Sequence, residues 1–308
     1  MQLRQALNSA VERLTSAQVP SPRMNAELLI MFTLDCDRAY LYAHPERVLT
    51  PDEMQRYDEA LARRATGVPA QYIAGHQEFW GLDLIVSPAV LIPRPETEHV
   101  VEAVLELVLG SSTKNGLDQE QGKRHQQQPR AGAPAPHILR IVDVGTGSGA
   151  IALALAKELP TAEIYATDVS PDALEVAQAN AARHNLSSRI EFCVADLLAG
   201  LPPVAFDFVV SNPPYVGESE EDSVQLEVRK FEPRNAVFAG PTGVEVIERL
   251  IPQAREALCP GGWLVFEISG TIADRVRSLL SSWDWDEVAI RNDLQGIARA
   301  AIARKTNL

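Results

Sequence analysis

Apolar residues recur at helical spacing through the first part of the chain. Leu3 and Leu7, for example, lie four positions apart, so they fall on one face of a helix. Further along, Thr50 and Glu53 have the spacing of a capping box, in which each side chain caps the backbone N–H of the other residue. We therefore predict an all-helical N-terminal domain over residues 1–75.

After the predicted helical domain, the composition changes to β-branched and aromatic residues. The stretch from Phe79 to Ile92, broken by Gly81 and Pro88, predicts a short hairpin. We assign residues 76–94 to a β-hairpin linker between two domains.

Residues 95–109 again have the apolar spacing of a helix. The pattern stops at residues 111–137, which consist mainly of Gly, Ser, Gln, Pro, Lys and Arg and include almost no large apolar side chain. Such a segment buries too little surface to offset the entropy of ordering it. We predict a disordered insert there.

Beyond this insert, strands and helices alternate. The expected strands span residues 139–144, 163–167, 189–194, 206–211, 263–268, 288–290 and 298–303. The expected helices span residues 150–159, 171–185, 244–258 and 272–280. Nearly continuous apolar strands separated by helices are typical of a doubly wound, mostly parallel sheet. We predict this α/β fold for residues 95–308, with a last antiparallel strand at one edge.

Charge and cysteine content narrow the classes of function. The net charge is −13, from 28 basic and 41 acidic residues, which disfavours indiscriminate binding to nucleic acid. Cys36, Cys193 and Cys259 are an odd number and lie far apart, so neither a disulfide framework nor a metal site is predicted. The sequence contains no apolar run long enough for a membrane span and no signal-peptide pattern, so we expect a cytoplasmic protein without membrane contact.

A glycine-rich turn lies between the first predicted strand of the sheet and the helix that follows it. It consists of Gly145, Thr146, Gly147, Ser148 and Gly149. Glycines allow a sharp turn and a close approach of the backbone to a ligand, and the helix start presents free N–H groups. We predict a nucleotide-type binding site here.

Two carboxylates end the next two strands. Asp168 lies 19 residues after Gly149, where it can accept hydrogen bonds from a ribose diol. Asp196 can accept from an adenine amino group, although a surface or capping carboxylate is an equal interpretation. The glycine run also fits a dinucleotide pattern that ends at Ala150, which leaves an oxidoreductase open.

The fourth strand of the sheet runs into Asn212, Pro213, Pro214 and Tyr215. The two prolines fix the backbone and lack N–H donors, so their carbonyls lie beside the Asn212 amide as acceptors. Asn212 Oδ1 and the Pro213 carbonyl can each accept one N–H of a planar –NH₂ group, while Tyr215 packs on its flat face.

This motif and the glycine run resemble S-adenosylmethionine-dependent methyltransferases that modify planar nitrogens, namely adenine N6 or glutamine N5. Other segments resemble the release-factor glutamine methyltransferase (HemK/PrmC) family along nearly the whole chain. They are Gln71 to Phe79, the signature Pro93 to Glu98, Val228 to Pro233, and Pro260 to Gly262 together with Glu267. The signature Pro93 to Glu98 is more specific than the Asn212 motif, which nucleic-acid enzymes share.

The resemblance implies a Rossmann-like class I methyltransferase that uses S-adenosylmethionine. It implies that the cofactor is bound by residues Gly145 to Gly149, Asp168, Asp196, Leu197 and Asn212. Leu197 stands where family members often have an aromatic residue beside the adenine, so an apolar contact is expected there. The resemblance assigns catalysis to Asn212, Pro213 and Tyr215, and substrate binding to these three and Pro214.

The implied substrate is the glutamine of the Gly-Gly-Gln loop in class 1 peptide chain release factors, with the N-terminal helices as a docking surface. A glutamine methyltransferase that acts on a ribosomal protein shares the catalytic motif and stays open. An adenine methyltransferase acting on DNA or RNA is disfavoured by the net charge of −13. An oxidoreductase has no use for the Asn212 motif. A non-catalytic binding module would need an obstructed donor pocket, and the intact glycines argue against one.

Overall fold

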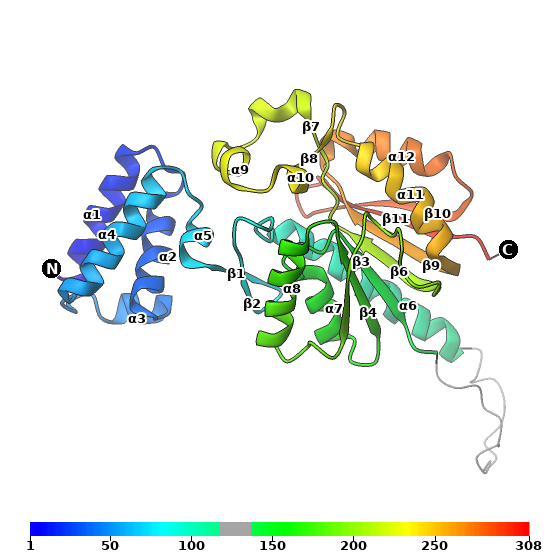
Figure 1. Cartoon of the computed structure of the whole chain (residues 1–308), viewed down its shortest axis with the longest axis horizontal. Helices are drawn as coiled ribbons and strands as arrows, with labels where there is room; N and C mark the ends of the chain where they lie inside the picture. Colours follow the sequence, from blue (N-terminus) through cyan, green and yellow to red (C-terminus); the bar gives the residue numbers. More distant parts are fainter. Residues whose placement is uncertain (118–136, 308) are drawn as a thin grey trace, which may run out of the picture.

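The helices of the N-terminal part pack around a hydrophobic core of their own (Figure 1). The computed structural model describes residues 1–117 and 137–307. The first helices are α1 (Leu3–Ser16), α2 (Pro22–Leu34), α3 (Arg38–Ala43), α4 (Pro51–Ala65) and α5 (Ala70–Ala74). The predicted capping box of α4 is confirmed, since Thr50 N–H donates to Glu53 and Glu53 N–H donates to Thr50, at 2.9 and 3.2 Å. Leu14, Leu29 and Ile30 close the core without exposure to solvent.

A hairpin follows the helices directly. Its strands are β1 (His76–Phe79) and β2 (Leu82–Ile85), paired antiparallel. Trp80 and Gly81 form its turn with φ of 53° and 67°, the left-handed geometry that a two-residue hairpin turn requires. The hairpin lies within the predicted linker 76–94, but the expected span from Phe79 to Ile92 is wrong, since the strands begin at His76 and end at Ile85. Val90 and Ile92 are apolar because they pack in a loop against Tyr72 and Ala173.

The helix after the hairpin is longer than its apolar pattern. A short 3₁₀ turn, η1 (Pro95–Thr97), leads into α6 (Glu98–Leu117). The prediction of a disordered insert from residue 111 is wrong for residues 111–117, which continue α6. A helix that is already formed extends at a lower cost than that of starting a new helix. Residues 118–136 of the predicted insert lie outside the described residues, and its last residue, His137, lies 2.7 Å from Asp207 Oδ1 through its Nε2.

The second part of the chain forms a central sheet with helices on both faces. Its strands are β3 (Arg140–Val144), β4 (Glu163–Asp168), β5 (Ile190–Val194), β6 (Phe206–Ser211), β9 (Leu258–Glu267), β10 (Trp285–Asn292) and β11 (Ala298–Lys305). Their order is β10-β11-β9-β6-β3-β4-β5. β11 runs antiparallel to both of its neighbours, and the remaining pairs are parallel. The mostly parallel α/β fold is confirmed, but the antiparallel strand lies one position in from the edge.

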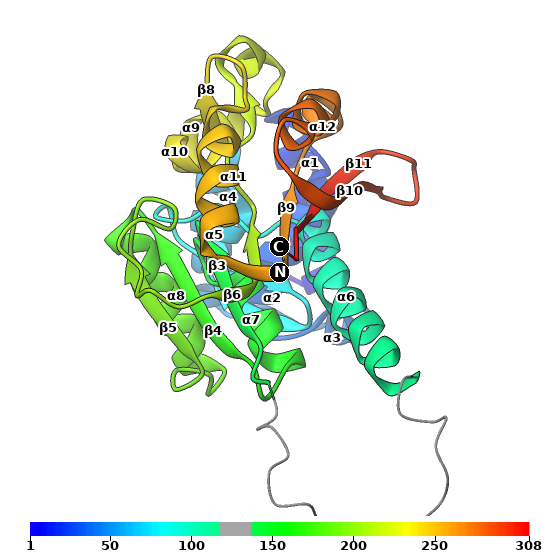
Figure 2. The same ribbon diagram turned by 90° about the vertical axis from the view of Figure 1, so that its right-hand side faces the viewer.

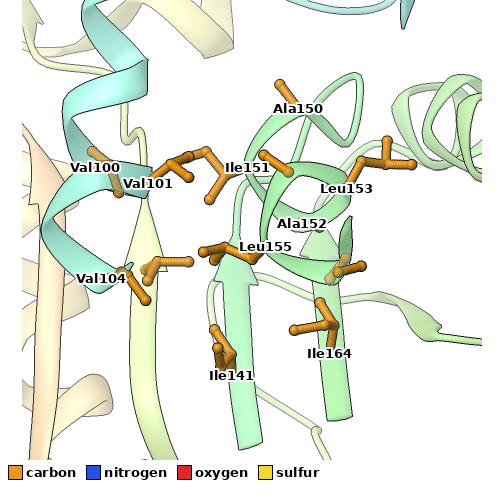
Figure 3. Packing of buried hydrophobic residues seen from close by; sticks show 14 of the residues in the cluster. Val100, Val101, Val104, Ile141, Ala150, Ile151, Ala152, Leu153, Leu155 and Ile164 are labelled. Carbon is orange, nitrogen blue, oxygen red and sulfur yellow. The ribbon is translucent and has the colours of Figure 1, made fainter. Parts of the chain in front are cut away.

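Alternating side chains divide the sheet between two cores. The helices are α7 (Ala150–Glu158), α8 (Pro171–Arg183), α11 (Glu245–Ala257) and α12 (Ala273–Ser281). Figure 2 shows α11 and α12 over one face and α6 and α7 over the other. In Figure 3, Val101 of α6 lies beside Ile151 of α7, and Leu155 of α7 lies above Ile141 of β3. Both faces of the strands are thus buried, which explains their continuous apolar sequences.

A segment that the sequence pattern did not predict follows the Asn212 motif. It contains β7 (Val216–Gly217), η2 (Glu218–Ser223), α9 (Leu226–Phe231), α10 (Arg234–Val237) and β8 (Phe238–Gly240). In Figure 1 its α9 lies between the N-terminal helices and the central sheet. Arg64 of α4 binds Glu227 of α9 at 2.6 Å. Glu232 accepts from Ile92 N–H at 3.0 Å and from Arg94 at 2.5 Å, so the segment contacts both the helices and the linker.

No helix among the described residues is long and apolar enough to cross a membrane.

Candidate active site

A cavity of about 390 Å³ opens at the carboxyl ends of the parallel strands. This edge of a doubly wound sheet is where ligands of such folds bind, and the volume lies in the range of small-molecule sites. The predicted residues that line it are Gly145, Thr146, Gly147, Ser148, Asp168, Asp196, Leu197, Asn212 and Pro214. The linker and the segment after the motif supply further walls, including Val90, Pro93, Thr97 and Asn235.

The glycine run forms the floor of the cavity. Gly145 and Gly147 have φ of 71° and 55°, and a side chain at either would meet no atom within 4 Å. Their left-handed backbone therefore needs glycine, and the space beside it is open to a ligand. Gly149 has a different role, because a Cβ there would lie 2.7 Å from Leu153 Cδ1. Such a Cβ would also lie 3.2 Å from Ala177 Cβ of α8, so Gly149 allows α7 and α8 to pack closely and does not line the cavity.

A buried carboxylate supports this floor from below. Asp143, at the end of β3, has no exposed surface. Its Oδ2 accepts from Thr146 Oγ1 at 2.6 Å and from the backbone N–H of Ala152 at 3.1 Å. Its Oδ1 has no hydrogen-bond partner among the described residues. Burial disfavours the charged form and raises the pKa of Asp143 to about 7, although the two hydrogen bonds oppose the shift.

Asp168 is held in place by backbone donors. Its Oδ2 accepts from Gly147 N–H and its Oδ1 from Ser170 N–H, both at 2.9 Å. An ionised carboxylate has about four lone-pair positions, so two remain for a ligand that carries hydroxyl groups. The side chain is thus fixed in orientation and still able to accept hydrogen bonds at the cavity wall.

The next wall combines a charged pair with a strained residue. Asp196 accepts from Arg249 Nη2 at 2.5 Å, and both side chains are more than half exposed. Leu197 has a φ of 57°, uncommon for a residue with a side chain, and its carbonyl accepts from Thr167 Oγ1 at 2.9 Å. Arg249 comes from α11 and was not among the site residues predicted from the sequence.

The Asn212 motif is connected to a buried network behind the cavity. Asn212 Nδ2 donates to Thr97 Oγ1 at 3.0 Å, and Thr97 Oγ1 donates to Glu267 Oε2 at 2.5 Å. The Tyr215 hydroxyl donates to Glu267 Oε1 at 2.9 Å. Burial is the largest cause that raises the pKa of Glu267, and the bonds from Thr97 and Tyr215 oppose it. Pro213 and Tyr215 do not line the cavity, whereas Asn212 does.

Comparison with known sequences identifies the family. Residues 5–75 match the sequence model of the PrmC N-terminal domain, and residues 133–230 match that of the methyltransferase small domain. A release factor glutamine methyltransferase of Koribacter versatilis (strain Ellin345) is 52% identical over 306 residues, 99% of each chain. The chain belongs to the release factor glutamine methyltransferase family. A member from Moorella thermoacetica is 43% identical and covers 91% of this chain and 89% of its own.

Solved structures are similar in fold. The hMettl16 catalytic domain in complex with MAT2A 3'UTR hairpin 6 has a TM-score of 0.55 and 17% sequence identity, over 81% of this chain and 82% of that one. A methyltransferase from Pyrococcus furiosus has a TM-score of 0.50 at 18% identity, over 81% and 99% of the two chains. At this identity the likeness concerns the fold alone.

The predicted family, fold class and enzyme type are therefore confirmed: the protein is a methyltransferase with a class I fold. This membership decides against the oxidoreductase and the non-catalytic binding module. Thr97 and Glu267 belonged to the family signatures in the sequence, yet no role could be assigned to them there. Their meeting with Asn212 depends on strand pairing, since Ser211 of β6 lies beside Phe266 of β9.

Proposed function

We propose that the protein transfers a methyl group from S-adenosylmethionine to the side-chain nitrogen N5 of a glutamine. The acceptor would be the glutamine in the Gly-Gly-Gln loop of class 1 peptide chain release factors. The observation that carries this proposal is the anchored Asn212 amide, whose oxygen has no partner among the described residues and stands at the cavity wall. The release factor is taken from the name of the full-length relatives.

The cavity is suited to the cofactor. The open backbone at Gly145 and Gly147 leaves room for its amino-acid part, and Asp168 retains lone pairs for its ribose hydroxyls. We assign the adenine to the wall formed by Asp196 and Leu197, where the leucine side chain offers an apolar contact. When bound, S-adenosylmethionine supplies an electrophilic methyl group on a positively charged sulfur.

The acceptor nitrogen needs orientation, because the lone pair of an amide is delocalised into its carbonyl. Asn212 Oδ1 and the Pro213 carbonyl would each accept one N–H of the substrate –NH₂, which directs the remaining lobe of the nitrogen toward the methyl group. Positioning of this kind can lower a reaction barrier by several kcal/mol. Tyr215, fixed by its bond to Glu267, would pack its ring along the plane of the bound amide, with Pro214 closing the site.

The rest of the chain provides the setting for this reaction. We assign residues 1–75 to docking of the release factor, 76–94 to the linker and 95–308 to catalysis. The net charge of −13 disfavours nucleic acid as a direct partner. A translation factor as substrate places the reaction in the cytoplasm.

Methyl transfer to parallel substrates tests the proposal. Purified protein and labelled S-adenosylmethionine are incubated with a release factor, with ribosomal protein and with duplex DNA. We expect label on the Gly-Gly-Gln glutamine, located by mass spectrometry, and a much slower but measurable transfer in Asn212→Ala at an unchanged melting temperature. Label on the ribosomal protein or DNA alone would refute the release factor as substrate.

A further inference from the structure

Two buried side chains, Thr97 and Glu267, lie beside the catalytic motif, and Thr97 also lines the cavity. Thr97 is the last residue of η1 and Glu267 the last residue of β9, and they are 4% and 1% exposed. Between them they connect Asn212 with Tyr215 through three hydrogen bonds of 2.5 to 3.0 Å. Burying a carboxylate is costly, so an arrangement of this kind needs compensating contacts.

The direction of each hydrogen bond follows from the number of protons available. Both oxygens of Glu267 accept, one from Thr97 and one from Tyr215, which is the pattern of an ionised carboxylate. The single hydroxyl proton of Thr97 is then committed to Glu267. Only a lone pair of Thr97 remains for Asn212, and a lone pair can bind the NH₂ end of the amide but not its oxygen.

We propose that Thr97 and Glu267 are positioning residues that hold the Asn212 amide with Oδ1 toward the substrate nitrogen. A reversed amide would place its NH₂ group against the substrate –NH₂, where two donors face each other and neither can bind. This inference rests on the proposed function, because it concerns the acceptor for a substrate amide. It explains why the Asn212 side-chain amide takes only one of its two possible orientations.

Burial raises the pKa of Glu267, and the hydrogen bonds from Thr97 and Tyr215 oppose that rise by favouring its charged form. Of the nearby charges, Glu96 of η1 raises the pKa of Glu267 and Arg299 of β11 lowers it. Arg299 itself binds Asp293 at 2.8 Å and lies 3.9 Å from Glu96, so its charge is shared between carboxylates. The two hydroxyl donors are therefore the direct partners of Glu267, and the loss of either leaves one oxygen without a bond.

The first test separates the effect of the Thr97 hydroxyl group on kcat from the effect of the side-chain volume. Thr97→Val keeps the volume and removes the hydrogen bonds, so kcat for release factor methylation should fall about 10- to 100-fold. The Kd for S-adenosylhomocysteine should stay within about threefold of wild type. Thr97→Ser should restore most of the lost kcat. Thr33→Val, which removes a buried hydroxyl in α2, is the matched control and should leave kcat unchanged.

A double-mutant cycle tests whether Thr97 acts through Asn212. If it does, Thr97→Val has no further effect on kcat in an Asn212→Ala background. Equal losses of kcat in both backgrounds, or an unchanged kcat in Thr97→Val, would overturn the inference.

A substrate-free measurement keeps this inference separate from the proposed function. The side-chain amide resonances of Asn212, identified by their loss in Asn212→Ala, should shift in Thr97→Val because their acceptor is gone. Unchanged resonances would overturn the inference whatever the substrate is. An inactive wild-type protein with shifted resonances would instead refute the proposed substrate alone.

Discussion

Replacing Asp143 by asparagine should change how the stability of the protein responds to pH. Asparagine is neutral at every pH, and its Oδ1 can accept the same two bonds from Thr146 and Ala152. Its NH₂ group takes the place of the oxygen that has no partner among the residues that the structure describes. The cost of that buried donor is independent of pH, so it cancels when two pH values are compared.

The magnitude follows from proton linkage. The folded protein has a pKa of about 7 at Asp143, whereas the same group in an unfolded chain titrates near its ordinary value of 3.8. Between these values the folded state binds the proton that the unfolded chain has released, so the free energy of unfolding decreases as pH rises. From about pH 5.5 to about pH 8.5 this group should cost the wild type about 2 kcal/mol. The asparagine variant should lack this part of the decrease.

Urea denaturation at both pH values measures the difference. Trp80, Trp263, Trp283 and Trp285 all lie outside the N-terminal helices, so their fluorescence reports on the part of the chain that holds Asp143. We expect the variant to gain about 2 kcal/mol on the wild type between the lower and the higher pH. Parallel pH profiles for the two proteins would refute the reasoning that burial holds the proton on Asp143.

Three further changes are predicted. Asp168→Asn should weaken binding of S-adenosylhomocysteine about 10- to 100-fold, measured by calorimetry, and an unchanged Kd would exclude a role in binding. Gly149→Ala should lower the free energy of unfolding by about 1–3 kcal/mol, since its Cβ would lie 2.7 Å from Leu153 at a left-handed φ. Arg64→Met and Glu227→Gln should destabilise the protein less together than the sum of the single changes, and additive effects would show that their contact contributes nothing.

The strands of the sheet could be predicted because strands that are buried on both faces have continuous runs of apolar residues. The strand Phe206–Ser211 was predicted to the residue. The hairpin was misplaced because residues His76 to Glu78 are polar and largely exposed, so β1 has no alternating apolar face. The segment of η2 and α9 was missed for a related reason, since its helical turns bury no side chain fully.

The residues of the candidate site likewise fall into those that the sequence could predict and those that it could not. Residues Gly145 to Gly149 and Asn212 to Tyr215 each lie on one loop, so local chemistry was enough to propose them. Thr97 and Glu267 meet across 170 positions of the chain, and no local pattern encodes that meeting. It requires α6, which follows Thr97 directly, to pack against β9, the strand that ends at Glu267.

The place of β11 has a consequence for the order in which the protein is synthesised and folded. β11 comes after the other strands in the chain, yet it lies between β9 and β10 and joins them. The nascent sheet therefore cannot connect these two strands until Ala298–Lys305 has been translated. The N-terminal helices close their core within the first 75 residues, so they can fold while the catalytic part is still incomplete.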